Sequence, residues 1–338
     1  MLNLSLAIER YDHVRDLIDG SVRADGIAFT VLNQPVEETF FRFIKYQEFD
    51  VSEMSFGKYV SMVASGDCPF VGLPVFPSRM FRHSSIYVRA DSGLTDASQL
   101  KGKRVGLPEW AQTASIYSRG FLAGQHGVAL TDVAWVQAGV MQAGRKEKVA
   151  LHLPPGVRYR AEPGKSLREM LLAGEIDAVL SARPPMVEAA DAAEAMNAPG
   201  ASNLRIVRMY PAYEPVEEAY FKRTGIFPIM HLIAIKREVV RQHPWVAMNL
   251  CKAFTTAKDN SLARMRDITA AHVPLPWAQA LAERAVAMLG EDFWPYGLEP
   301  NRTTLEAFTR FAHEQGVTAR KVAVEELFPE NVLASVKV

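Results

Sequence analysis

Residues 27–54 read IAFTVLNQPVEETFFRFIKYQEFDVSEM and set out a strand, a helix and a second strand. The β-branched and aromatic run Ile27–Leu32 predicts the first strand. Pro35 suits the first turn of a helix, and the two glutamates after it stand where the helix dipole favours acidic side chains. Apolar residues recur along that helix, and Phe49–Met54 predicts the second strand. This stretch is therefore a strand–helix–strand unit.

The same alternation continues on both sides of this unit. Leu2–Ile8 predicts a strand before it, and a helix through Tyr59–Ser65 follows it. Phe70–Val75 and Ser84–Val88 then read as further strands. This order is typical of a mostly parallel sheet covered by helices, so we expect an α/β protein.

Composition limits the function classes. The chain has 338 residues, of which 49% are hydrophobic and 22% charged, with 38 basic and 38 acidic residues. Such a chain is globular, and a zero net charge gives no indication of a nucleic-acid partner. No apolar run is long enough for a membrane helix, and charged residues interrupt the N-terminus. We therefore expect no membrane partner and a cytoplasmic protein, for which self-association into a homo-oligomer is compatible with the neutral charge.

The order of motifs resembles the type II periplasmic binding proteins. Residues 99–106 (QLKGKRVG) are similar to the segment that opens the second lobe of that family. Ser84–Arg89 and Leu232–Lys236 resemble the two strands on which the chain crosses between lobes. The resemblance implies two α/β lobes, each a mixed and mostly parallel sheet with flanking helices, and a ligand cleft between them. Lobe one would take residues 1–88 and 232–338, with the C-terminal helices, and lobe two residues 89–231.

Four longer runs resemble the 4,5-dihydroxyphthalate decarboxylase family. They are PVEETFF (35–41), FPSRMFRHS (76–84), TGIFPIMH (224–231) and DFWPYGLEPNR (292–302). The resemblance implies a lyase of aromatic-compound catabolism that converts 4,5-dihydroxyphthalate to 3,4-dihydroxybenzoate and CO2 without oxidation. The alternative is a binding protein without catalysis whose ligand is an aromatic or dicarboxylic acid.

A small aromatic dicarboxylate requires cations and hydrogen-bond donors. Arg79 and Arg82 lie close together just before a predicted crossing strand, and the planar guanidinium can hold a carboxylate at two points. Both could instead be surface charges of a loop. Arg183 follows the second-lobe strand, where amino-acid binders of this fold commonly carry an acid, and an arginine there suits an acidic ligand; it could equally be an exposed residue.

Further binding residues are expected from their places in the fold. Gln112 and Thr113 open a predicted helix, whose free backbone N–H groups favour an anion. Tyr11 and Arg15 lie in the loop after the first strand, where an aromatic ring could stack on the ligand. Ser55 follows the strand that ends at Met54 and could donate a hydrogen bond.

The reaction needs a proton donor and a partner for the hydroxyl group. Histidine suits both roles because its pKa lies near neutrality. His83 and His231 each begin a predicted crossing strand, so we expect them to act as the acid/base pair, although each could be a hydrogen-bonded structural histidine. No cofactor motif or metal-ligand spacing is present, so no cofactor and no metal site are predicted, while a divalent metal on the substrate hydroxyls is not excluded.

Overall fold

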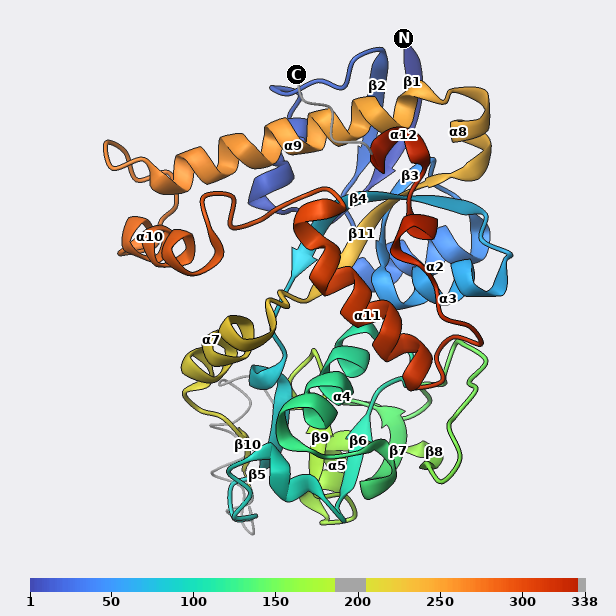
Figure 1. Cartoon of the computed structure of the whole chain (residues 1–338), viewed down its shortest axis with the longest axis vertical. Helices are drawn as coiled ribbons and strands as arrows, with labels where there is room; N and C mark the ends of the chain where they lie inside the picture. Colours follow the sequence, from blue (N-terminus) through green and yellow to red (C-terminus); the bar gives the residue numbers. More distant parts are fainter. Residues whose placement is uncertain (186–204, 334–338) are drawn as a thin grey trace. The chain divides into compact units, whose positions relative to one another are not determined.

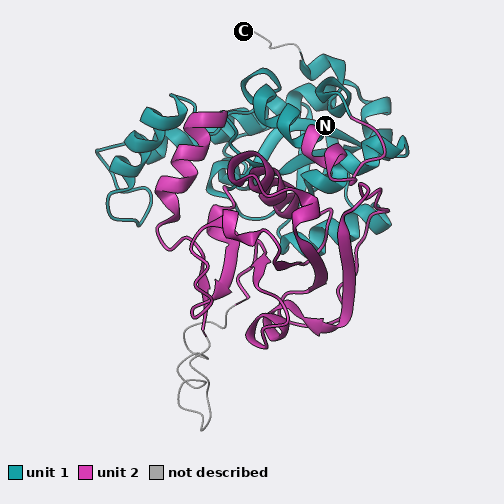
Figure 2. Ribbon diagram, turned by 60° about the horizontal axis from the view of Figure 1, so that its bottom comes forward, with its two compact units in different colours: residues 1–80, 225–309, 322–338 teal, residues 81–224, 310–321 magenta. Residues whose placement is uncertain are grey.

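The computed structural model, which describes residues 1–185 and 205–333, divides into two compact units. Figure 2 shows unit 1 in teal and unit 2 in magenta. Unit 1 comprises residues 1–80, 225–309 and 322–338, and unit 2 comprises residues 81–224 and 310–321. Both units are α/β, as the strand and helix pattern predicts.

Unit 1 is built on a five-stranded mixed sheet. In spatial order its strands are β2 (Ile27–Leu32), β1 (Leu2–Ala7), β3 (Val51–Ser55), β11 (Ile229–Lys236) and β4 (Phe70–Arg79). β1 runs parallel to β2 and β3, whereas β11 runs antiparallel to β3 and β4. β3 and β11 are almost wholly buried; β11 is rich in apolar residues, whereas β3 (VSEMS) also buries Ser52 and Glu53.

The helices of unit 1 pack on this sheet or on one another, and Figure 1 labels most of them. They are α1 (Arg15–Ile18), α2 (Val36–Tyr46), α3 (Phe56–Ser65), α8 (Arg237–Gln242), α9 (Trp245–Arg266), α10 (Ala278–Leu289) and α12 (Glu330–Leu333). The 22-residue α9 contacts α1, α10 and β4. No helix in the described ranges combines the length and apolar character needed to cross a membrane.

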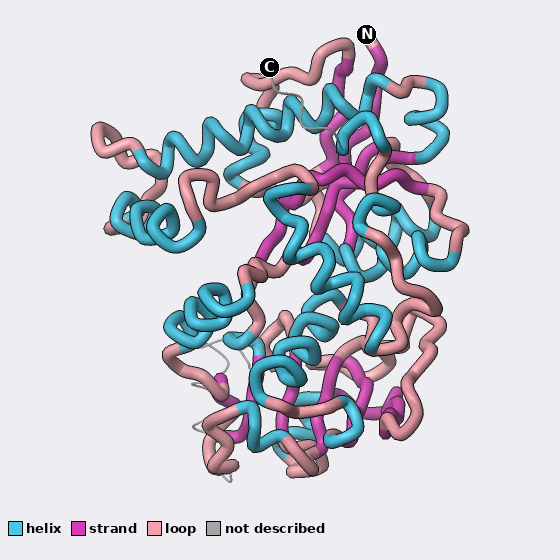
Figure 3. The backbone as a smooth tube through the Cα atoms, viewed as in Figure 1, coloured by secondary structure: helices cyan, strands magenta, loops and turns pink. Residues whose placement is uncertain are grey.

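Unit 2 has a six-stranded mixed sheet. In spatial order its strands are β10 (Ile206–Arg208), β5 (Ile86–Arg89), β9 (Ala178–Leu180), β6 (Arg104–Leu107), β7 (Ala134–Gly139) and β8 (Arg158–Ser166). Its helices are α4 (Thr113–His126), α5 (Leu167–Leu172) and α7 (Tyr213–Thr224). The secondary structure of both units is coloured in Figure 3.

The chain passes between the units at places that differ from the predicted ones. It leaves unit 1 after residue 80 and returns at residue 225, before rather than within the predicted crossing strands. β5 lies in the sheet of unit 2, and β11 lies in the sheet of unit 1. In addition, α11 (Arg302–Glu314) begins in unit 1 and ends in unit 2. Residues 310–321, which the sequence assigns to lobe one, therefore belong to unit 2.

Exposed apolar side chains gather in one segment of unit 1. Ile268, Leu275, Trp277 and Leu281 are each at least 49% exposed, and they lie between α9 and the start of α10. Large apolar groups are normally scattered singly over a surface, so a cluster of this kind often marks a contact surface.

Candidate active site

A buried carboxylate, that of Glu53 on β3, lies at the centre of the candidate site in unit 1. Its side chain is 0% exposed, and its oxygens accept hydrogen bonds from the Tyr11 hydroxyl (2.6 Å) and the Glu9 backbone N–H (3.2 Å). A carboxylate can be buried only when such partners replace water. The loop after β1 supplies both donors, so β1 and β3 build this part of the site together.

His231 on β11 completes this network. In the sheet it is paired with Ser55 of β3 on one side and with Ser78 of β4 on the other. Its Nδ1 lies 2.6 Å from the same Glu53 oxygen that accepts the Tyr11 hydroxyl. Residues paired across strands share a face, and residues two apart on a strand share it too, so Glu53, Ser55, His231 and Ser78 belong to one face.

The outer part of His231 remains accessible. Its side chain is 18% exposed, and the ring of Phe40 meets it edge-on with centroids 4.9 Å apart. Nδ1 is engaged by Glu53, whereas Nε2 has no hydrogen-bond partner within the described ranges. The free nitrogen is therefore the one that can exchange a proton with a ligand.

Tyr11 and His13 stand beside this pair. Burial, followed by the charge of Glu53, raises the pKa of Tyr11 well above its ordinary value, so its hydroxyl stays protonated and donates a hydrogen bond to Glu53. Burial lowers the pKa of His13 to about 4, which leaves its ring neutral at pH 7. The His13 ring packs against Tyr11 and against Trp294, whose indole donates to the Phe76 carbonyl.

The other residues predicted for unit 1 take different positions. Ser55 lies next to His231 in the sheet, whereas Arg15 is at the start of α1, where its half-exposed guanidinium pairs with Asp12 at 3.1 Å. Arg79 is only 5% exposed and donates to the carbonyls of Phe227 (3.2 Å) and Pro295 (2.6 Å) and to the Asn301 side chain. This arginine therefore holds the segment before α11, and its role as a carboxylate clamp stays a prediction.

His83 and Arg82 lie in unit 2. His83 is 1% exposed, stacks on Phe121 and has its Nε2 3.0 Å from the Gln125 side-chain oxygen. Burial lowers the pKa of His83 to about 4, so its ring is neutral at pH 7. Burial also lowers the pKa of Arg82, to about 10, which keeps it cationic at neutral pH.

Gln112, Thr113 and Arg183 are also in unit 2. Gln112 caps α4 and Thr113 begins it, while Arg183 is exposed just after β9. A carboxylate of the chain itself already lies near the start of α4, because Glu147 accepts hydrogen bonds from the backbone N–H groups of Trp110 and Ala111. This contact lies just ahead of the helix, and ligand binding by Gln112 and Thr113 stays a prediction.

Sequence reasoning missed Glu53, and it placed His13 only in the loop that also carries Tyr11 and Arg15. Glu53 is the acid in the strand VSEMS, and an acid within an otherwise buried strand is itself a signal, because unpaired carboxylates are rarely buried. His13 carries a weaker sequence signal, because it joins the site through packing against Trp294, a residue remote in the sequence. Within residues 1–185 and 205–333, no three His, Cys, Asp or Glu side chains gather in a way that would hold a metal ion.

Solved structures place the fold among the periplasmic binding proteins. The aliphatic sulphonate-binding protein SsuA of Escherichia coli matches 98% of this chain and 99% of its own with a TM-score of 0.52 at 12% identity. A periplasmic sulfonate-binding protein of Methylobacillus flagellatus matches 98% of this chain and 93% of its own with a TM-score of 0.51, also at 12% identity. These likenesses confirm the predicted fold.

Sequence relatives identify the family. A 4,5-dihydroxyphthalate decarboxylase of Comamonas testosteroni is 36% identical over 338 residues, which cover 100% of this chain and 99% of the relative. One of Pseudomonas putida is 44% identical over 185 residues, or 54% of this chain and 72% of the relative. No protein-family model matches the sequence. The chain belongs to the 4,5-dihydroxyphthalate decarboxylase family, a group of carboxy-lyases.

Proposed function

We propose that this protein removes one carboxylate from 4,5-dihydroxyphthalate, with 3,4-dihydroxybenzoate and CO2 as products. Membership of the family supports the reaction class. The observation that carries the proposal is the pair formed by buried Glu53 and partly accessible His231, because it supplies a proton donor held by a carboxylate.

The chemistry of the substrate sets what the protein must supply. Each carboxylate of this substrate lies para to a hydroxyl group, which pushes electrons toward the carbon that bears the carboxylate. Addition of a proton to that carbon interrupts the aromatic system. Cleavage of the carbon–carbon bond then releases CO2, and the electron pair of that bond restores aromaticity. The net reaction consumes one proton, which the protein must deliver.

His231 is the proposed proton donor. An ionised carboxylate can only accept hydrogen bonds, so Glu53 fixes the proton of His231 on Nδ1 and directs Nε2 toward the ligand. The charged imidazolium donates its Nε2 proton to the ring carbon and is neutral after the step. Glu53 stabilises the cation beforehand, and Tyr11 and Glu9 hold Glu53 in place.

Some of the remaining predicted residues receive supporting roles in this proposal, whereas Arg15, Arg79, Gln112, Thr113 and Arg183 stay predictions as substrate-binding residues. Tyr11 and Ser55 adjoin the Glu53–His231 pair, and Arg82 is a buried cation that suits the carboxylate the reaction spares. His83 stays a prediction as the second acid/base group; its neutral ring could accept a hydroxyl proton but is a poor donor at pH 7. We also propose that the protein acts in the cytoplasm on this small aromatic dicarboxylate.

The test is a turnover assay with purified protein. We expect 4,5-dihydroxyphthalate to yield CO2 and 3,4-dihydroxybenzoate, and His231→Gln to lose at least a hundred-fold in kcat, on the order of a general acid's contribution. His272→Gln, an exposed histidine of the same unit, is the matched control and should retain wild-type turnover. A parallel assay with EDTA decides whether a divalent metal takes part. Full activity in His231→Gln would refute the assignment.

The rival function is binding without catalysis. The observation behind it is the fold, which resembles that of sulfonate-binding proteins over nearly the whole chain. That function predicts a rise in melting temperature with 4,5-dihydroxyphthalate but no release of CO2 at any pH tested. The same samples used in the turnover assay can report both quantities.

A further inference from the structure

A second pocket lies in unit 1, at the ends of β4 and β11 remote from the Glu53–His231 pair. Its volume is about 420 Å³, within the range of small-molecule sites. Val71 of β4 is in its lining, seven residues along the strand from Ser78, the neighbour of His231. β4 is irregular between these residues, and Val71 pairs with Ile235 of β11, four residues from His231, which is about 13 Å at about 3.3 Å per residue. The lining of the pocket includes neither Glu53 nor His231, so the two sites are distinct.

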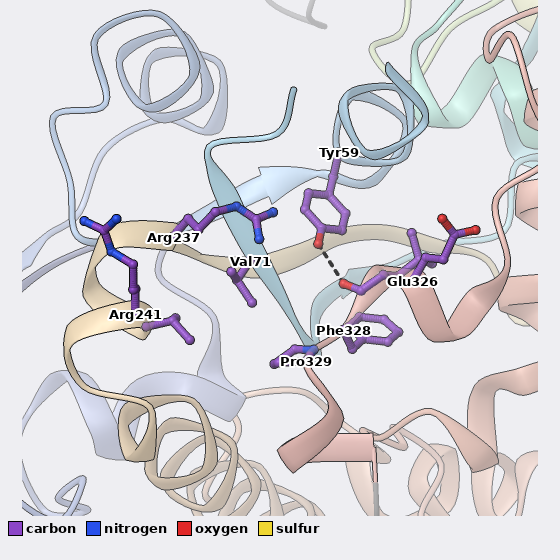
Figure 4. A pocket seen from close by; sticks show the side chains of 9 residues that line it. Tyr59, Val71, Arg237, Arg241, Glu326, Phe328 and Pro329 are labelled. Carbon is purple, nitrogen blue, oxygen red and sulfur yellow. Dashed lines mark hydrogen bonds between the residues drawn. The ribbon is translucent and has the colours of Figure 1, made fainter. Parts of the chain in front are cut away.

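The wall of this pocket is apolar and firmly held. Figure 4 shows Val71, Phe328 and Pro329 beside the phenol ring of Tyr59. The Tyr59 hydroxyl donates to the Leu327 carbonyl at 2.7 Å and accepts from the Gly72 N–H at 2.8 Å. Because both of its hydrogen-bonding capacities are used within the protein, Tyr59 braces the wall and leaves the pocket preformed.

Two arginines on α8 supply the charge. The Nε and Nη2 groups of Arg237 donate to the carbonyls of Cys68 (3.0 Å) and Phe70 (3.1 Å), which fix the position of its guanidinium at the pocket. Arg241 is four residues later, on the same side of the helix. Within the described ranges neither guanidinium is paired with a carboxylate, so both positive charges face the pocket region uncompensated.

The one acidic residue of the lining does not cancel these charges. Glu326 accepts the Ala323 N–H at 2.8 Å as part of the cap of the short turn Val324–Leu327. The lining therefore combines an apolar wall, two arginines and one carboxylate already engaged by the backbone. This chemistry complements a small apolar body that carries one negative charge.

We propose that this pocket binds a small aromatic monocarboxylate. The ring packs against Val71 and Phe328, and the carboxylate is bound by Arg237 and Arg241. The product of the reaction proposed above belongs to this ligand class, although the argument for binding stands on the pocket alone. The site is thus a second ligand site, separate from the one that performs the chemistry.

The probe is 4-fluorobenzoate, followed by fluorine NMR on the full chain. We expect saturable binding at millimolar concentration, a loss of about ten-fold in affinity for Arg241→Gln, and no binding at this site for Val240→Trp, which fills the pocket from α8. Arg241 is exposed, so its replacement leaves the fold intact. Neutral 4-fluorobenzamide should bind more weakly and equally to wild type and Arg241→Gln.

The control is His231→Gln, which alters the candidate active site and leaves this pocket unchanged. Wild-type affinity in that variant, together with loss in Arg241→Gln and Val240→Trp, supports the second site. The proposal is overturned when wild type shows no saturable binding, when both pocket variants bind as wild type does, or when only His231→Gln loses affinity. Because turnover is not the readout, failure of this proposal is distinguishable from failure of the proposed reaction.

Discussion

Replacing Glu53 with glutamine isolates the contribution of one buried charge. The carboxylate oxygen Oε1 receives two contacts of 2.6 Å, from the Tyr11 hydroxyl and from His231 Nδ1, while Oε2 receives the Glu9 N–H. Glutamine keeps the size of the side chain but offers one oxygen and one amide group. With its oxygen at the Oε1 position, the amide turns its NH2 group toward the Glu9 N–H, so a donor faces a donor. In the reverse orientation Tyr11 and His231 lose their shared acceptor, and in both orientations the negative charge is gone.

The size of the effect follows from these contacts. A general acid contributes about 10²- to 10⁴-fold, and the variant retains the imidazole but not the carboxylate that holds it. We therefore expect kcat for 4,5-dihydroxyphthalate to fall on the order of 10²-fold, which corresponds to about 2.7 kcal/mol in the activation free energy. The buried donor conflict should also lower the free energy of unfolding by about 1–3 kcal/mol.

The assay measures kcat and KM from CO2 release, and unfolding in urea checks that the variant is folded. Tyr11→Phe serves as a matched control, because it removes one hydrogen bond to Glu53 and keeps the charge. Its kcat should fall far less than that of Glu53→Gln, and KM should change little in either variant. A folded Glu53→Gln protein with kcat within about three-fold of wild type would refute the role given to the pair.

Three further predictions follow from single contacts. The pKa of His83 is about 4 in the folded protein and 6.5 in the unfolded chain, so between these values the unfolded chain binds the extra proton. The free energy of unfolding should therefore fall by up to about 3 kcal/mol as the pH drops from about 6.5 to 4. Urea unfolding of His83→Gln should lack this part of the pH dependence, and an unchanged profile would contradict the prediction. In Arg79→Lys, the single ammonium group cannot satisfy the carbonyls of Phe227 and Pro295 together with Asn301, so the variant should lose about 2–4 kcal/mol of stability with little change in KM. A large rise in KM with normal stability would instead support Arg79 as the carboxylate clamp. If the chain self-associates, the exposed cluster around Trp277 and Leu281 is the expected contact, and Leu281→Glu should lower the mass seen by light scattering; a wild-type monomer would end that expectation.

The strands and helices were largely readable from the sequence because their signals are local. Apolar runs with turn residues between them fixed Leu2–Ala7 and Ile27–Leu32 to within a residue. The passage between units was not readable in the same way, since a strand that belongs to one sheet has the same pattern as a strand that crosses between two. β5 and β11 show this, because each lies wholly within one unit.

The candidate site was only partly predictable, because its contacts join distant residues. His231 and Ser55 were expected separately, and sheet register rather than sequence spacing places them side by side. Arg79 illustrates the opposite outcome. Its three partners lie between 148 and 222 residues away in the sequence, so a motif that suggested a ligand clamp gave no sign that the protein itself would use the guanidinium.

Glu53 then separates stability from function in this unit. A buried ion pair is often no more stabilising than apolar residues of similar volume, because both charges must leave water. A leucine at position 53 would suit the strand between β1 and β11, but Tyr11 and His231 would lose their shared acceptor. The carboxylate is therefore better explained by the proposed role of His231, whose tautomer it fixes by accepting from Nδ1, than by any gain in packing. On this reasoning Glu53 is present in β3 because of its contact with His231, and the strand does not need it to fold.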